Sequence, residues 1–307
     1  MTAGRYESFF VKACHPEGGR GVWIRYTTHQ RPGDWPTGSL WFTLFDVSAE
    51  RPRAHKTTVA GPSSGDGEWL RVGESYIGPG VAHGDADGIE WDLRFSSDEA
   101  PLCHLPGAWM YRAPLPKTKL MSPLPAARFD GSLAVDGMPI ELEGWRGTVG
   151  HNWGSQHAER WIWLHGLSRS GDWLDVALGR LKLGPLTTPW VANGVLSLGG
   201  VRAVLGGLGR AVRVRETPEG CAFEIPGRGL RLRGDVSGAG KDFVGWLYAD
   251  PDGGEHHAVN CSVADLRARV DRRGAAPKDF SVEAGAAYEL GMRERDHGMA
   301  IEPFPDG

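Results

Sequence analysis

An alternation of apolar and polar residues with a period of two runs through most of this sequence and constrains its fold more than any other feature. In GIEWDLRF, residues 88–95, the four apolar side chains fall on one face of an extended chain and the three charged side chains fall on the other. Side chains alternate between the two faces of a strand. The pattern therefore predicts a half-buried antiparallel β-strand.

Similar short runs, mostly bounded by Gly, Pro, Asp or Ser, recur along the whole chain. They predict strands at residues 6–15, 21–29, 39–47, 68–77, 88–95, 108–113 and 132–143, and again at 161–168, 173–182, 191–198, 211–216, 222–225, 230–236, 243–249, 258–270 and 281–293. Only residues 199–209, GGVRAVLGGLG, have a pattern compatible with a short helix, which their glycines disfavour.

Many short strands with almost no helical segment are typical of β-sandwiches and β-barrels. One barrel of eight to ten strands uses roughly 150 residues. The 307 residues therefore predict an all-β chain with two such units in tandem, at residues 1–156 and 157–307. No low-complexity linker separates them, so we expect the two halves to share an interface.

The charge balance is that of an ordinary globular protein. The chain has 34 Lys and Arg against 38 Asp and Glu, a formal net charge of -4 at pH 7. Arginines cluster at residues 210–215 and 228–233, but their alternate spacing indicates the solvated face of strands. We expect no nucleic-acid partner, because a phosphate backbone requires a basic surface.

The sequence also predicts no transmembrane segment and a cytoplasmic location. No stretch approaches the roughly 20 apolar residues of a membrane-spanning helix, and the first residues lack the pattern of a signal peptide. Cys14, Cys103, Cys221 and Cys261 are widely spaced and form no CxxC motif. This favours free thiols in a reducing compartment. Oligomeric state is left open by these features.

Tryptophan is unusually frequent, with 13 residues. Its large flat side chain fits either a thick hydrophobic core or an aromatic-lined ligand cavity. The region GTVGHNWGSQHAERWIWLHG, residues 147–166, concentrates three of the tryptophans with three histidines. We interpret it as a segment at the junction of the two halves that lines a pocket, with an aromatic core as the alternative. In the core interpretation, His151 and Asn152 satisfy backbone groups and Gly150 and Gly154 supply unusual backbone angles.

Three charged residues interrupt apolar strands near the N-terminus. Glu7 and Lys12 belong to the first predicted strand, and Arg25 belongs to the second. A buried charge is costly unless it is paired. These side chains are therefore exposed, matched to one another or directed at a ligand.

Several of these segments together resemble one protein family. ESFFVKA, HPEG, GVWIRYT, IEWDLRF, GTVGHNWG and WIWLHG are similar to segments of the tandem lipocalin-like family that includes the bacterial carotenoid 1,2-hydratases (hydroxyneurosporene synthases). More distantly, the chain resembles plant tocopherol cyclases and the lipocalin-like Diels–Alderases. The resemblance implies two lipocalin-like (calycin) antiparallel β-barrels, a pocket for an apolar ligand and no cofactor.

The chain departs from the hydratase pattern at one position. Hydratase members carry an acidic residue immediately before His-Asn-Trp-Gly, where this chain has Gly150. Hydration and ring closure of the family's kind begin with protonation of an alkene, which requires an acid in a dry pocket and aromatic faces for the carbocation. Without an acid at 150, the candidate donors are Glu7, Asp92, Glu143, Glu159 and His151.

We expect Glu7 and His151 to be the catalytic residues, because both lie in segments that carry the resemblance. The residues expected to bind substrate are Trp23, Arg25, Trp145, Asn152, Trp153, Trp161, Trp163 and His165. A pericyclic reaction would need only shape and polarising hydrogen bonds, which His151, Asn152 and Arg25 would supply. Trp161, Trp163 and His165 also fit simple core packing.

Other chemistries lack their sequence signatures. His151, His157 and His165 do not have the spacing by which one element offers two metal ligands. His256 and His257 lie in a glycine-rich turn, where adjacent side chains point in opposite directions. We expect no metal site. A serine nucleophile of the GxSxG kind sits at a strand–turn–helix, and GVLSLGG does not have this form in a chain where helical segments are scarce. The chain contains no GxxxxGK[ST] motif.

The sequence thus predicts a cofactor-independent cyclase, pericyclase or hydratase that acts on an apolar isoprenoid- or polyketide-like molecule near the barrel junction. The alternative is a non-catalytic carrier of a hydrophobic ligand, which barrels of this size also accommodate. An enzyme should place Glu7, Arg25 or His151 on the cavity wall beside tryptophans. A carrier should show an almost unbroken apolar lining.

Overall fold

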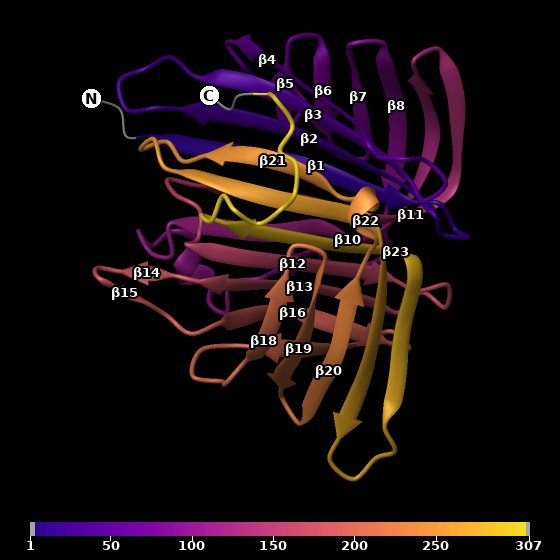
Figure 1. Cartoon of the computed structure of the whole chain (residues 1–307), viewed down its shortest axis with the longest axis vertical. Coiled ribbons are helices and arrows are strands. Elements are labelled where there is room, and N and C mark those ends of the chain that lie inside the picture. Colours follow the sequence, from indigo (N-terminus) through magenta and orange to yellow (C-terminus); the bar gives the residue numbers. More distant parts are fainter. Residues whose placement is uncertain (1–3, 305–307) are drawn as a thin grey trace.

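The structure, a computed structural model, describes residues 4–304 and is almost entirely β-sheet (Figure 1). The first half contains β1 (Arg5–Cys14), β2 (Arg20–Gln30), β3 (Thr37–Asp46), β4 (Arg53–Ala60), β5 (Leu70–Val72), β6 (Ser75–Gly78), β7 (Val81–Ala86), β8 (Ile89–Ser96), β9 (Leu102–Cys103), the 3-10 turn η1 (Ala108–Tyr111), β10 (Thr118–Val135) and β11 (Met138–Gly154).

The second half contains β12 (Arg160–Leu167), β13 (Trp173–Arg180), β14 (Lys182–Leu183), β15 (Leu186–Thr187), β16 (Val191–Leu198), β17 (Val201–Gly206), β18 (Arg213–Thr217), β19 (Gly220–Gly227), β20 (Leu230–Ser237), the 3-10 turn η2 (Gly240–Asp242), β21 (Val244–Ala249), β22 (Glu255–Arg272) and β23 (Lys278–Met292).

The first half is one antiparallel sheet rolled around its own core. Its strand order is β4-β3-β2-β1-β11-β10-β8-β7-β6-β5, with β9 added to β10. Side chains from strands along the whole path, among them Ile24, Phe42, Trp91 and Phe129, form one buried apolar cluster. In β8 the burial alternates residue by residue, as the period-two pattern predicts.

The second half closes into a barrel. Its strands follow the order β17-β16-β13-β12-β23-β22-β20-β19, and a pairing between β17 and β19 closes the circle. β18 extends β19, β21 pairs with the start of β22, and β14 and β15 form a separate hairpin. Both halves are therefore antiparallel and lipocalin-like, as expected.

The two halves pack face to face across β1, β2 and β3. These strands are buried along nearly their whole length on both faces. One face belongs to the first core, whereas Trp23, Trp41 and Phe45 on the other face belong to the core of the second half. Trp246 of β21 completes this contact, with its ring 5.2 Å from that of Trp41 and 6.3 Å from that of Trp23.

The strands that bury both faces also explain two of the charges in the N-terminal hairpin. The side chain of Lys12 is buried and its Nζ donates a 2.5 Å hydrogen bond to the carbonyl of Gly285 in the second half. Arg25 is buried against aromatic rings of the same interface. Glu7, by contrast, is about half exposed.

Some strand predictions are wrong in detail. Residues 199–209 form β17 and its turn instead of a helix, and residues 108–113 contain η1 instead of a strand. The expected strand at 132–143 is the tip of a hairpin, with β10 and β11 joined at Asp136 and Gly137. β4 and β7 fall outside the predicted ranges, although burial along β7 alternates residue by residue.

β11 ends at Gly154 and β12 begins at Arg160, so the hydrogen-bonded sheets divide between these residues. The domain limits of 1–156 and 157–307 stay a prediction. Among residues 4–304, the structure contains no helix of the length and apolarity that a membrane span requires.

Replacement of Trp246 by alanine should destabilise the whole protein, because the indole is fully buried between the two halves. Truncation of a buried tryptophan costs about 3–5 kcal/mol, which denaturant unfolding would measure. The matched control is Trp35→Ala, whose side chain is 90% exposed and whose loss should cost less than about 0.5 kcal/mol. Equal effects of the two substitutions would contradict the interface described here.

Candidate active site

A cavity of about 480 Å³ lies where the two halves meet. Strands of both halves supply its wall, and the loop that contains η1 covers part of it. The wall includes Tyr6, Phe10, Trp23, Arg25, Trp109, Met121, Ser122, His151, Asn152, His157, Trp161, Trp163, Leu178, Tyr248 and Glu289. The size suits a small molecule, and the lining combines aromatic surface with a few polar groups.

Arg25 is held on this wall by aromatic rings. Its guanidinium carbon lies 4.3 Å from the ring centre of Tyr248 and 5.4 Å from that of Trp41. A cation over an aromatic face is stabilised by the ring quadrupole. Burial raises the pKa of Tyr248 well above its usual value, so its hydroxyl stays protonated and can donate a hydrogen bond.

Glu289 of β23 places a carboxylate on the same wall. Oε1 accepts a 2.8 Å hydrogen bond from Nε1 of Trp161, and Oε2 accepts from Nδ2 of Asn260 at 3.1 Å and from the Tyr248 hydroxyl at 3.3 Å. Three donors stabilise the negatively charged form of a carboxylate. The cavity therefore presents a fixed negative charge beside the tryptophan faces.

A second buried carboxylate, Asp175 of β13, supports another part of the wall. It accepts hydrogen bonds from the Ser122 hydroxyl at 2.6 Å and from Nε1 of Trp163 at 3.1 Å, and Nε2 of His104 lies 3.6 Å away. Nε2 of His104 also lies 3.3 Å from the Ser122 hydroxyl oxygen. The arrangement orients Trp163 toward the cavity.

Six of the ten predicted site residues line this cavity, and four do not. On the wall are Trp23, Arg25, His151, Asn152, Trp161 and Trp163; away from it are Glu7, Trp145, Trp153 and His165. Arg25 and His151 thus meet the expectation for polar groups beside tryptophans, whereas Glu7 does not.

Trp145 and Trp153 lie on the other face of β11 from Asn152. Trp145 is buried in the core of the first half, and Trp153 stacks on the ring of His151 at 4.3 Å. Successive side chains of a strand point to opposite faces, so Trp145 and Trp153 point away from the face that carries Asn152. His151 shares their face, where it stacks on Phe9, and borders the cavity only at its edge. The expected contact of the two tryptophans with substrate is therefore not supported by their position.

His165 is a structural residue of the inter-barrel core. It is fully buried, and its Nε2 donates a 2.9 Å hydrogen bond to the carbonyl of Pro125. Burial, followed by the charge of Lys12, lowers its pKa to about 4. The ring is therefore neutral at neutral pH.

Glu7 and His151 form a pair at the edge of the site. Nε2 of His151 donates a 2.9 Å hydrogen bond to Oε1 of Glu7, and the imidazole stacks on Phe9 at 3.9 Å. The Glu7 side chain is 46% exposed, whereas that of His151 is 14% exposed. Glu7 is not part of the cavity wall and contacts His151.

The glycines of the GHNWG segment allow close packing and do not supply unusual backbone angles. Neither Gly150 nor Gly154 has a positive φ. A Cβ atom on Gly150 would lie 2.1 Å from Cζ of Phe10, whose ring packs edge-on against Trp163 at 5.1 Å. The acidic residue of the hydratase pattern would meet this ring, so Phe10 occupies its space.

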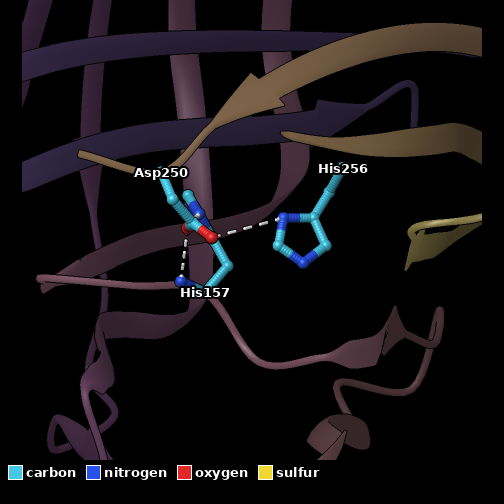
Figure 2. A group of neighbouring side chains, drawn as sticks. All are labelled: His157, Asp250 and His256. Carbon is cyan, nitrogen blue, oxygen red and sulfur yellow. Dashed lines mark hydrogen bonds and ion pairs between the residues drawn. The ribbon is translucent and has the colours of Figure 1, made fainter. Parts of the chain in front are cut away.

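Three residues could hold a metal ion: His157, Asp250 and His256 (Figure 2). The expectation of no metal site considered ligands close together in the sequence, whereas these residues come from separate segments. Asp250 Oδ1 accepts hydrogen bonds from the backbone N–H of His157 at 2.7 Å and from its Nδ1 at 2.8 Å. Burial alone would raise the pKa of Asp250, but these contacts with His157 lower it below its usual value.

Sequence reasoning missed Glu289, Tyr248 and Asp175. Glu289 interrupts the apolar run AAYELGM, and Asp175 interrupts WLDVALG. The same signal that drew attention to Glu7 and Lys12, a charge inside an apolar strand, marks both carboxylates.

Comparison of the sequence with known proteins finds relatives but no family model. No protein-family model matches the chain. The uncharacterized proteins MT0513 and Rv0493c of two Mycobacterium tuberculosis strains are each 27% identical to it over 332 residues, which cover 100% of this chain and 91% of theirs.

Two solved structures have a similar architecture. Kievitone hydratase from Nectria haematococca has a TM-score of 0.61 at 11% identity and covers 97% of this chain and 90% of its own. A protein from Nitrosomonas europaea described as AttH has a TM-score of 0.59 at 11% identity, with coverage of 95% and 93%. At this low sequence identity, the structural similarity shows only that the lipocalin-like fold is shared. The specific resemblance to carotenoid 1,2-hydratases stays a prediction.

Gly150→Ala should destabilise the protein by more than about 2 kcal/mol, since overpacking forces neighbours to move. Phe10→Ala should relieve that cost, because it removes the ring that a new Cβ meets. Denaturant unfolding of both single variants and the double variant would form a double-mutant cycle. Simple additivity would show that Phe10 is not the obstacle.

Stability should decrease as the pH falls from about 6.5 to about 4, because His165 resists protonation in the folded state but not in the unfolded state. This histidine alone should account for about 3 kcal/mol. His165→Gln should reduce the slope of unfolding free energy against pH over this range, whereas His83→Gln, at an exposed histidine, should not. An unchanged slope in His165→Gln would contradict this assignment.

Proposed function

We propose that this protein is a cofactor-independent cyclase or hydratase that acts on an apolar isoprenoid- or polyketide-like small molecule in the cavity between the two halves. The observation that carries the proposal is the Glu289 carboxylate on an aromatic wall, held by Trp161, Tyr248 and Asn260. A passive carrier does not require a fixed charge at this position. The similarity in fold to a hydratase is consistent with this choice.

The cavity wall suits a reaction that passes through a carbocation. Trp161 and Trp163 offer faces that attract positive charge, and Glu289 adds a preorganised negative charge whose hydrogen bonds are already formed. Charge that is fixed before reaction costs no reorganisation in the transition state. In a hydration, the same carboxylate is placed to accept a proton from water.

The proton that starts the reaction comes from the Glu7–His151 pair in this proposal. His151 borders the cavity, and its Nε2–H is held by Glu7 at 2.9 Å. The proton delivered to the substrate is therefore the Nδ1–H of the doubly protonated ring, which returns to the neutral form. Glu7 then acts as a positioning residue, because it lies away from the cavity wall and contacts His151. Arg25 and Asn152 orient polar groups of the substrate.

The non-catalytic alternative is a carrier that sequesters an apolar ligand in the same cavity. It is favoured by the exposed apolar residues Trp109, Leu115 and Leu208, which line the cavity and are at least half exposed. Native mass spectrometry of the purified protein, followed by denaturing extraction, would identify a co-purified molecule under either function. Only an enzyme would convert that molecule or its precursor.

With the extracted molecule as a probe, Glu289→Gln should lower the turnover rate by about 100-fold, the typical effect of removing one preorganised electrostatic contact. Ligand occupancy should remain, since glutamine keeps the size of the side chain. Glu283→Gln, an exposed carboxylate on the same strand, is the matched control. Full activity of Glu289→Gln would reject the assigned role, and absence of turnover in the unaltered protein would favour the carrier.

A further inference from the structure

His157, Asp250 and His256 are brought together from three segments of the chain. His157 lies in the link between β11 and β12, Asp250 follows β21, and His256 lies near the start of β22. Figure 2 shows the Asp250 carboxylate between the two imidazole rings. One nitrogen or oxygen atom from each residue can be chosen so that all three lie within 4.8 Å of one another.

The group contains several buried polar atoms without hydrogen-bond partners in residues 4–304. These are Nε2 of His157, Oδ2 of Asp250 and both ring nitrogens of His256. The His256 and Asp250 side chains are fully buried, and that of His157 is 9% exposed. Buried polar atoms in native proteins nearly always have a partner, so these four atoms are available to bind a ligand.

We propose that these three residues bind one divalent transition-metal ion of the Zn²⁺ or Co²⁺ type. Two imidazoles and a carboxylate are the ligands that such ions favour. Nδ1 of His256 and Oδ2 of Asp250 are 3.8 Å apart, a separation that two ligands at about 2.1 Å from one ion can span. The three ligand atoms lie within 4.8 Å of one another, so the side chains must draw closer together to reach one ion.

Neighbouring charges define what the ion must compete with. Arg293 places Nη2 3.6 Å from Oδ2 of Asp250, but its Nε is bound to Glu159 at 3.0 Å. When Asp250 binds the ion, Arg293 can therefore keep its ion pair with Glu159. Asp250 and Glu159 together carry two negative charges against the single positive charge of Arg293, which leaves the site favourable to a cation.

The position of the site gives the ion a structural role. Bound there, it would tie the link between the halves to the β21–β22 turn, next to the cavity. The His157 ring stacks on Tyr6 at 4.2 Å and on Trp161 at 5.4 Å, and both aromatic residues line the cavity. The ion would therefore fix this part of the wall, and the inference does not depend on the proposed reaction.

The test uses the full chain without an affinity tag, stripped with a chelator and then dialysed against Zn²⁺ or Co²⁺. Elemental analysis should find one equivalent of Zn²⁺, Co²⁺ should give a visible absorption spectrum, and Zn²⁺ should raise the Tm. His256→Ala and Asp250→Asn should each weaken binding at least tenfold and abolish the rise in Tm.

The matched control is His257→Ala. This residue is adjacent to His256 but points away from the group, and its Nδ1 lies 2.8 Å from Nε2 of His297. It should retain the metal and the rise in Tm. Failure of the unaltered protein to bind either ion would overturn the proposal, as would loss of binding in His257→Ala together with normal binding in His256→Ala.

Discussion

The structure depends on the burial of one strand face against a second barrel. β1, β2 and β3 have a core on each side, so they cannot follow the simple alternation of a half-exposed sheet. Trp23, Trp41 and Trp246 fill the contact between the halves, and Lys12 crosses it to reach a backbone carbonyl. A chain that lost this interface would expose a large apolar surface on each half, which hydrophobic burial strongly opposes.

The cavity is a consequence of the same contact. Two curved surfaces pack closely where tryptophans meet and leave space where Phe10, Asn152 and Trp163 line the gap. Polar groups at this position come from both surfaces: Arg25 from the first half, Glu289 and Tyr248 from the second. The polar groups of the cavity wall are therefore held by the interface, and their placement depends on its packing.

Strand content and the two-part organisation could be read from the sequence, because alternation and turn residues are local signals. The strand 88–95 illustrates this, since its burial alternates as β8. The cavity wall could be predicted only in part. Trp161 and Asn152 were found from an aromatic segment with a family resemblance, but Trp145 and Trp153 lie on the other strand face, whose direction depends on register. Glu289, 282 positions after Glu7 in the sequence, joins the site through long-range pairing of β23 with β12, which no local pattern encodes.

Because both halves contribute to one cavity wall, neither half can be exchanged without a change in that wall. Neither half holds a complete set of the wall residues, so exchange of one barrel between relatives would create a new wall instead of transferring an existing specificity. The shape and charge of the cavity are a property of the pair of surfaces, so a substitution on one surface alters the space that faces the side chains of the other.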